Sequence, residues 1–270
     1  MSTSSAPVTG LLPVAGKGLR IAPLPCSKEL FPIGFRRDAR TGEVRPQVAS
    51  HHVLEKFHRA GVGNAYVILR NGKWDIPAYF LDGEVAGLHL AYIVISDSAG
   101  PADTLDRAYC FVREHTIAFG FPDIQFGPDD VFTRLLDHLN ARGADIVLGL
   151  YPAANVTAMD MVDIDESGRV RALQLKPRVT ELRYTWVCAV WRPAFTEFMH
   201  AFVVSEGLQS GRSAYGDIDA GGDLPIGLVI KAAVEHGIQA YALRFDSESY
   251  IDIGTPGDLA EVIRRSAALL

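Results

Sequence analysis

Short apolar runs alternate along the chain with stretches of mixed polarity. The runs have the length of strands and are rich in Val, Ile, Leu and aromatic residues, at positions 64–70, 88–95, 145–150 and 239–245. Amphipathic stretches with helical spacing lie between them, at positions 46–60, 104–118, 129–142 and 224–235. Three of these are followed by a glycine where a helix C-cap glycine belongs, at Gly61, Gly143 and Gly237. The alternation predicts an α/β fold with a mostly parallel, Rossmann-like mixed sheet and helices on both of its faces.

The pattern changes between positions 161 and 191, where strand-length runs follow one another without a helix. Runs at 161–165 and 170–175 flank the segment Asp165-Glu166-Ser167-Gly168, which has the composition of a hairpin turn. A further strand is predicted over 184–191. We therefore expect a small antiparallel lobe packed against the parallel sheet.

Two polar segments are predicted to be loops. Positions 36–43 are turn-forming and predict an exposed hairpin, and positions 205–222 contain five glycines and predict a mobile flap. The chain has no internal repeat and no low-complexity segment. We expect one domain over residues 1–270.

Charge and cysteine content restrict the partners and the compartment. The chain has 270 residues and a net charge of -6, with no run of lysine or arginine longer than a pair, which argues against nucleic acid or an anionic membrane as partner. Residues 1–5 are small and polar without a basic flank, so we expect neither a signal peptide nor a membrane span and assign the protein to the cytoplasm. Cys26, Cys110 and Cys188 are too widely spaced for a zinc site or a disulfide framework, and we expect neutral or buried thiols.

A glycine loop near the start of the chain carries the strongest chemical signal. The apolar strand at 10–14 leads into Gly16 and Gly18, and the cations Arg20 and Lys28 follow. Glycines let backbone N–H groups approach phosphate oxygens closely, and fixed cations supply the countercharge. The same glycines would also serve an ordinary strand-to-helix turn, so the following cations are what favour a polyphosphate site.

Further polar residues follow other predicted strands. Asp123 closes the short apolar run at 119–122, Lys176 ends the strand at 170–175, and Asp252 lies between a short strand and the last helix. Ligands of open parallel sheets bind at the carboxyl ends of strands. Two carboxylates with nearby cations suit Mg²⁺-assisted transfer at a phosphate, although each residue taken singly also fits a turn, a cap or a solvated strand end.

Two other kinds of chemistry have no support. His51 and His52 are adjacent and would point in different directions, so they do not form a metal pattern. Neither a Ser-His-Asp signature nor a Gly-x-Ser-x-Gly elbow is present.

From about residue 10 to residue 262 the chain resembles the sugar nucleotidyltransferases (nucleoside-diphosphate-sugar pyrophosphorylases, including glucose-1-phosphate thymidylyltransferases). Its opening loop is similar to the family signature Gly-x-Gly-Thr-Arg with a following Pro-Lys. The segment Pro13-Val14-Ala15-Gly16 most resembles the form of this signature found in bacterial UDP-glucose pyrophosphorylases. Four later segments resemble family elements in the same order: Ala102–Ala108, Phe121–Phe126, Leu175-Lys176-Pro177 and Tyr250–Pro256. Five matches in order are far more specific than any one of them.

The resemblance implies a reaction and a set of roles. A sugar 1-phosphate would attack the α-phosphorus of a nucleoside triphosphate, giving an NDP-sugar and pyrophosphate, with Mg²⁺ as cofactor. The implied metal ligands are Asp123 and Asp252, and the implied catalytic cations are Arg20 and Lys28. Nucleotide contacts are implied for Ala15, Gly16, Lys17, Gly18 and Arg107, and acceptor contacts for Lys176, Asp160 and Cys188. Residues 1–140 would form a nucleotide-binding half, 141–254 an acceptor-binding half with the sugar-side antiparallel lobe, and 255–270 a C-terminal helix; relatives are often dimers or tetramers.

The departures from the family pattern lie mainly on the acceptor side. Leu19 replaces the loop threonine while Lys17 adds a cation, and Thr104 with Arg107 replaces a Gly and a Gln beside the base. Leu175 replaces the glutamate that binds sugar hydroxyls, and Met159-Asp160 replaces a Tyr-Gly pair. The acceptor therefore stays open between a sugar 1-phosphate, a modified sugar phosphate, a cyclitol phosphate and a phosphonate, with dTTP, UTP or CTP as donor.

Two alternatives to nucleotidyl transfer differ in how well the sequence supports them. A nucleotide-binding regulatory protein without turnover is compatible with the altered acceptor side. A nicotinamide-dependent oxidoreductase is not, because Ile21 occupies the third glycine position of its fingerprint and Glu43 lies in a polar loop instead of ending a second strand.

Overall fold

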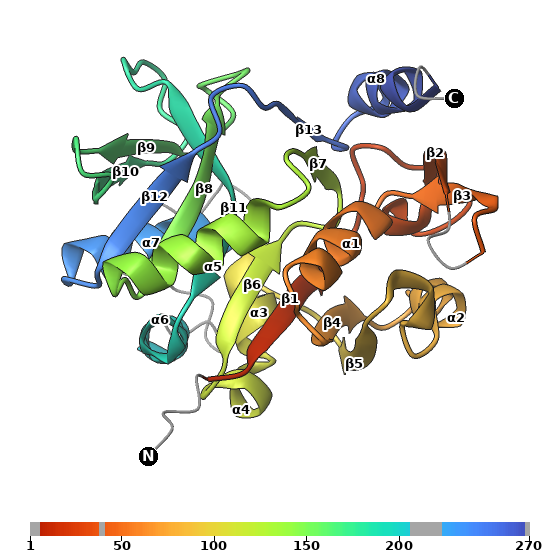
Figure 1. The fold of residues 1–270 in the computed structure, drawn as a ribbon, viewed down its shortest axis with the longest axis horizontal. Coiled ribbons are helices and arrows are strands. Elements are labelled where there is room, and N and C mark those ends of the chain that lie inside the picture. Colours follow the sequence, from red (N-terminus) through yellow and green to blue (C-terminus); the bar gives the residue numbers. More distant parts are fainter. Residues whose placement is uncertain (1–5, 38–40, 206–222, 268–270) are drawn as a thin grey trace.

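A mixed sheet of nine strands forms the centre of the molecule (Figure 1). The computed structural model describes residues 6–37, 41–205 and 223–267, and all structural statements below concern these ranges. The sheet contains β1 (Val8–Val14), β4 (Asn64–Arg70), β5 (His89–Ile95), β6 (Thr116–Gly120), β8 (Ile146–Pro152), β9 (Met161–Ile164), β10 (Val170–Gln174), β11 (Tyr184–Trp191) and β12 (Ala240–Arg244).

The sheet has a parallel half and a mixed half. β1 lies between β4 and β6 and is parallel to both, and β5 extends this half beyond β4. β11 joins the halves, since it runs antiparallel to β6 on one side and to β8 on the other, and β12 is parallel to β8. The β9–β10 hairpin attaches to β11 through Thr185 and Met161. Because β1, β5 and β6 point the same way, the loops after them meet at one edge of the sheet.

Helices cover both faces, which explains why the strands are apolar on both sides. In β1, Leu11 packs into one core and Leu12 into the other, as expected from the two-residue alternation of strands. One core contains residues of α3 (Pro101–Asp106), α4 (Tyr109–Val112), α6 (Pro193–Ser205) and α7 (Ile226–Glu235). The other contains residues of α1 (His51–Arg59), α2 (Asp75–Phe80) and α5 (Val131–Arg142).

Two small strand pairs lie outside the main sheet. β2 (Pro32–Arg37) pairs antiparallel with β3 (Val44–Val48), and β7 (Ile124–Phe126) pairs antiparallel with β13 (Tyr250–Asp252). The last helix, α8 (Pro256–Ala267), packs against β2. A third core of Ile21, Ile33, Ala49, Ile253 and Val262 joins the glycine loop, β2, β13 and α8. Short 3-10 turns are η1 (Lys28–Leu30) and η2 (Glu84–Ala86).

The predicted α/β class, the mostly parallel sheet and the antiparallel hairpin at 161–175 are confirmed. Gly61, Gly143 and Gly237 all have positive φ just past their helices, as a C-cap glycine requires. β4 and β11 have the predicted bounds. None of the helices in the described ranges is long and apolar enough to cross a lipid bilayer.

Two predicted helices were wrong in extent. The stretch 104–118 holds the end of α3, then α4, then the beginning of β6, because Ile117 is buried in a central strand paired with β1 and helical spacing stops at Val112. The stretch 46–60 becomes helical only at His51, because its first residues belong to β3.

Two of the predicted loops lie only partly within the described residues. β2 and β3 form the two arms of the hairpin predicted at 36–43, and residues 38–40 lie outside the described residues. The flap predicted at 205–222 begins where α6 ends, and residues 206–222 lie outside the described ranges.

We expect Gly100→Ala to destabilise the fold by about 3 kcal/mol. Gly100 has a φ of 125°, and a Cβ there would lie 2.7 Å from the carbonyl oxygen of Leu224 and overlap its backbone. Leu224 is bound to this loop on both sides, through Ala99 and Ala102. Gly61→Ala is the matched control, because Gly61 also has positive φ but faces open space, so only the conformational cost of about 1 kcal/mol applies. Equal losses in urea titrations would contradict the proposed close contact.

Candidate functional site

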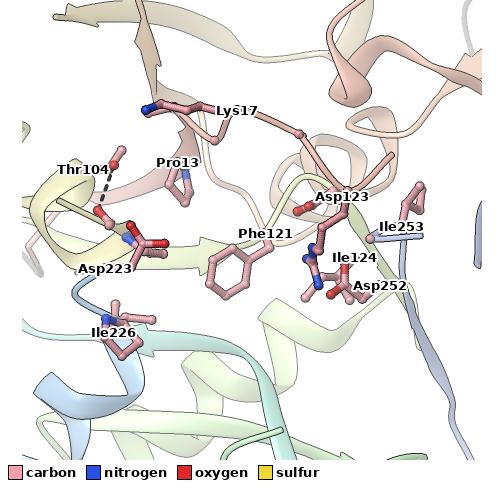
Figure 2. A pocket seen from close by; sticks show the side chains of 18 of the residues that line it. Pro13, Lys17, Thr104, Phe121, Asp123, Ile124, Asp223, Ile226, Asp252 and Ile253 are labelled. Atoms are coloured by element: carbon pink, nitrogen blue, oxygen red, sulfur yellow. Dashed lines mark hydrogen bonds between the residues drawn. The ribbon is translucent and has the colours of Figure 1, made fainter. Parts of the chain in front are cut away.

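A cavity of about 580 Å³ opens at the edge of the sheet where the loops after β1, β5 and β6 meet. Residues that follow β10 and β13 complete its wall, together with the beginning of α7. Figure 2 shows Asp123 and Asp252 at one end of the cavity, Thr104, Asp223 and Ile226 at the other, and the Phe121 ring between them.

The glycine loop forms one wall of the cavity. Ala15, Gly16, Lys17, Gly18 and Arg20 all line it, directly after β1. Gly18 has a φ of 64°, which favours glycine, and a Cβ on Gly16 would have no atom within 4 Å. The loop therefore leaves backbone N–H groups accessible to a ligand. Leu19, in place of a hydroxyl-bearing residue, is 75% exposed.

Strand pairing brings Asp123 and Asp252 together from distant parts of the chain. Asp252 pairs with Ile124, the residue after Asp123, and the N–H of Ile253 donates to the carbonyl of Asp123 at 2.9 Å. The sequence placed both aspartates at strand ends but gave no indication of this antiparallel pairing.

His52 holds β7 from the side of α1. Its Nε2 accepts the N–H of Phe126 at 2.7 Å, and burial lowers the pKa of His52 to about 3, so the ring is neutral. His51 also accepts a backbone bond, from the N–H of Val48. Both histidines thus have structural hydrogen bonds and point to different partners.

The aspartate pair concentrates negative charge. Burial, followed by the charge of Asp123, raises the pKa of Asp252 to about 6, and Lys28 and Arg20 act in the opposite direction. Lys28 Nζ forms an ion pair with Asp123 Oδ2. Burial lowers the pKa of Lys28, but Asp123 together with Glu29 and Asp252 outweighs burial, and the net pKa is raised. A Cβ on Gly254 would lie 3.1 Å from Arg20 Nη2, so glycine lets this guanidinium approach Asp252.

These residues fit a divalent cation whose coordination shell is completed by oxygen atoms of a bound ligand. No group of three or more His, Cys, Asp or Glu side chains suited to a metal is found within the part of the chain that the structure describes. Mg²⁺, however, is commonly held by one or two carboxylates with phosphate oxygens and water as its other ligands. The half-buried carboxylates of Asp123 and Asp252 supply that part of the donor set, and burial together with the charge of Asp123 raises the pKa of Asp252.

Two of the residues predicted to contact the acceptor, Lys176 and Asp160, line the cavity. Lys176, directly after β10, has a φ of 40°, a left-handed backbone that is uncommon for a side-chain-bearing residue and is concentrated at functional sites. Asp160 lines the same region, and its carboxylate lies against Gly227 in the first turn of α7, where a negative charge is favoured. The contact of either residue with an acceptor stays a prediction.

Two predicted site residues lie elsewhere. Arg107 follows α3 with its side chain half exposed, and its Nη2 pairs with Asp103 at 3.1 Å. Cys188 is fully buried in β11, where burial raises the pKa of its thiol. Neither residue is among those that line the cavity.

The cavity also contains residues that the sequence did not single out. They include Glu29, Asp97, Trp186 and Asp223. Asp97 follows β5, so the rule of strand carboxyl ends could have found it. Glu29 is next to Lys28 in sequence, but nothing local indicates that its buried carboxylate pairs with Lys73, 44 positions away.

Comparison with known proteins gives one family and one fold. The model of the family described as "Nucleotidyl transferase" matches residues 10–268. No curated protein sequence matches the chain. The fold is similar to that of a UDP-glucose pyrophosphorylase complexed with UDP-glucose, with a TM-score of 0.77 and 14% identity over 98% of this chain and 100% of the other. It is also similar to a protein from Bacillus anthracis described as a glucose-1-phosphate thymidylyltransferase, in complex with sucrose, with a TM-score of 0.75 and 16% identity over 96% and 95% of the two chains.

Proposed function

The chain belongs to the nucleotidyl transferase family of enzymes, and from that premise we propose that it joins a nucleoside triphosphate to a sugar phosphate or a sugar-like phosphate. A phosphate oxygen of the acceptor attacks the α-phosphorus of the triphosphate and forms a new P–O bond. The bond between the α-phosphorus and the bridging oxygen breaks, and pyrophosphate leaves with that electron pair. The nucleophile is already an anion, so no side chain has to remove a proton.

One observation carries the proposal: Asp123 and Asp252, 129 positions apart, lie side by side at a cavity that also holds Lys28 and Arg20. A pair of carboxylates repels a polyanion unless a cation lies between them. The arrangement therefore favours a metal-bound triphosphate over a free sugar or an uncharged ligand.

In the proposed mechanism the fixed cations neutralise charge that develops on the phosphates. Arg20 and the N–H groups of the glycine loop hold the β- and γ-phosphates, while Lys28 moves from Asp123 to the triphosphate near the reacting phosphorus. Lys176 holds the acceptor phosphate in line for attack. Positioning and charge neutralisation supply the rate acceleration.

Asp123 and Asp252 are the residues that would hold Mg²⁺. When bound there, Mg²⁺ would act as a Lewis acid and orient the phosphate oxygens.

The division of the cavity follows the chain. We propose that residues 1–140 contribute most of the nucleotide contacts and residues 141–254 most of the acceptor contacts. For Arg107 and Cys188 we propose indirect roles, in α3 and in β11, because neither side chain lines the cavity. Leu175 and Asp160 argue for an acceptor other than glucose 1-phosphate, such as a modified sugar phosphate, a cyclitol phosphate or a phosphonate. dTTP, UTP and CTP are the donors to test first.

The test is pyrophosphate release with each nucleoside triphosphate, Mg²⁺ and a panel of sugar 1-phosphates, cyclitol phosphates and phosphonates. We expect release with at least one pair, and NTP formation in the reverse direction from the corresponding product and pyrophosphate. Saturable NTP binding in calorimetry without turnover in either direction would favour a regulatory nucleotide-binding protein instead.

Lys176→Met should separate acceptor binding from donor binding. We expect KM for the acceptor to rise about tenfold to a hundredfold while KM for the triphosphate stays within about twofold, because the variant removes one phosphate contact on one substrate. Arg178→Ala is the control, an exposed cation two positions away that does not line the cavity. An equal rise in both KM values would contradict the assignment of Lys176 to the acceptor.

A further inference from the structure

Lys28 lies in η1, a 3-10 turn too short for its own hydrogen bonds to fix the position of Lys28. η1 has three residues, and its N-cap Ser27 makes no side-chain capping bond to it. Lys28 still reaches the cavity and pairs with Asp123, so its position is fixed from outside η1.

The residue before Lys28 is held by Asp75. The backbone N–H of Ser27 donates to Asp75 Oδ2 at 2.6 Å, and the Ser27 hydroxyl donates to Asp75 Oδ1 at 2.8 Å. Both carboxylate oxygens are thus used on one residue, which fixes the backbone as well as the side chain of Ser27.

The residue after Lys28 is held by Lys73. Lys73 Nζ lies 2.8 Å from Glu29 Oε1 and 2.9 Å from Glu29 Oε2, with side chains that are 10% and 2% exposed for Lys73 and Glu29. The carbonyl of Glu29 also accepts the N–H and the hydroxyl of Ser50, at 3.0 and 2.8 Å. A buried ion pair of this kind is costly to break and restricts the position of both partners.

Lys73 lies in the turn between β4 and α2, and Asp75, two positions later, is the first residue of α2; Trp74 between them is 55% exposed. That turn is tied to the sheet, since the N–H of Asn71 donates to the carbonyl of Ile95 and the N–H of Lys73 to that of Arg70. Residues 73–75, in a segment anchored to the sheet, therefore hold the residue before Lys28 and the residue after it by hydrogen bonds and an ion pair. Neither Lys73 nor Asp75 lines the cavity.

We infer that Lys73 and Asp75 are positioning residues that fix Lys28 for the triphosphate, an inference that rests on the proposed function. By holding Ser27 and Glu29, they determine where the Lys28 ammonium group can lie when it exchanges Asp123 for a phosphate oxygen. A shift of about 1 Å in a reacting or charge-neutralising group can cost about a hundredfold in rate.

A purely structural role predicts a different result from a role that acts through Lys28. A structural role lowers stability and affects activity equally whether or not Lys28 is present. A positioning role has a kinetic effect that disappears when Lys28 is absent, because the positioning residue acts only through Lys28. The effects of the two substitutions are then not additive.

The experiment is a double-mutant cycle of Asp75→Ala and Lys28→Met, in which the buried Glu29–Lys73 pair stays intact. We expect Asp75→Ala to lower kcat/KM for the triphosphate about tenfold to a hundredfold in the wild-type background and less than about threefold in the Lys28→Met background. The same factor in both backgrounds, or no effect in the wild-type background, would overturn the inference.

Three further variants make the result of the cycle interpretable. Ser27→Ala removes only the hydroxyl arm and should give a smaller effect of the same kind, while Trp74→Ala, on the same turn, should leave kinetics unchanged. For the Lys73 arm, Glu29→Gln with Lys73→Met removes both charges together and avoids a buried unpaired charge. This pair should also lose its kinetic effect in the Lys28→Met background.

The affinities of all variants for dTTP, UTP and CTP are measured by calorimetry in parallel. Binding without turnover by the wild-type protein would reject the proposed function, while the affinity cycle would still decide the inference. If the wild-type protein turns over and the effects of the Asp75 and Lys28 substitutions are additive, the inference is rejected while the proposed function stands.

Discussion

Replacing Asp252 by Asn should lower turnover by about a thousandfold, the equivalent of roughly 4 kcal/mol in the activation free energy. The amide keeps the shape of the side chain and the β7–β13 pairing but removes one of the two carboxylates proposed to hold Mg²⁺. The measurement is pyrophosphate release at saturating Mg²⁺ with the best substrate pair. Turnover within a factor of three of wild type would reject Asp252 as a metal ligand.

The same variant should gain stability when Mg²⁺ is removed with EDTA. The folded-state pKa of Asp252 is about 6 against an ordinary value of 3.8, so the folded protein binds this proton more tightly than the unfolded chain does. The contribution of Asp252 to stability therefore falls as pH rises from about 4 to 6 and stays unfavourable at neutral pH. Asp252→Asn removes it, and we expect a gain of about 1–3 kcal/mol at pH 7 in urea titrations. Asp137→Asn, at an exposed position of α5, should change neither stability nor activity.

Replacing Lys28 by Met should lower kcat/KM by about a hundredfold to a thousandfold, with the opposite effect on stability. The variant removes the cation that pairs with Asp123, so in EDTA two neighbouring carboxylates remain with less compensation. We expect a loss of about 1–3 kcal/mol in EDTA and partial recovery at millimolar Mg²⁺, monitored by thermal unfolding.

Lys17→Met serves as the comparison for Lys28, because Lys17 lines the same cavity but, within the described residues, forms no ion pair with Asp123 or Asp252. It should cost less activity and leave the dependence of stability on Mg²⁺ unchanged. If both lysine variants behaved alike, general loss of positive charge would explain the result better than a specific role of Lys28.

The sequence was informative where local pattern and global fold agree. β4 and β11 each contain a run of apolar and aromatic residues of strand length, so their bounds could be predicted from the sequence, and Asp123 and Lys176 follow β6 and β10 as predicted. The prediction of one helix over 104–118 was wrong because Leu105, Ala108 and Val112 have helical spacing and the buried strand β6 follows shortly after them. Pairing of that strand with β1 is a tertiary interaction that no local window contains.

Contacts between distant segments were the part that could not be predicted. The meeting of Asp123 with Asp252 depends on the β7–β13 pairing, and the fixing of Lys28 depends on a turn 45 positions later. Residues such as Lys73 and Asp75 carry no motif, and a surface salt bridge is the ordinary expectation for both. Only their partners show that they belong to the surroundings of the cavity.

The position of β13 has a consequence for the order in which the protein becomes competent during synthesis. Every strand of the nine-stranded sheet lies before residue 245, whereas Asp252 and the helix that packs behind it follow β12 in the chain. A nascent chain that has emerged to residue 245 already contains the whole sheet, the glycine loop and Lys176. It would nevertheless lack half of the proposed metal site until the segment after β12 has emerged and β13 has paired with β7.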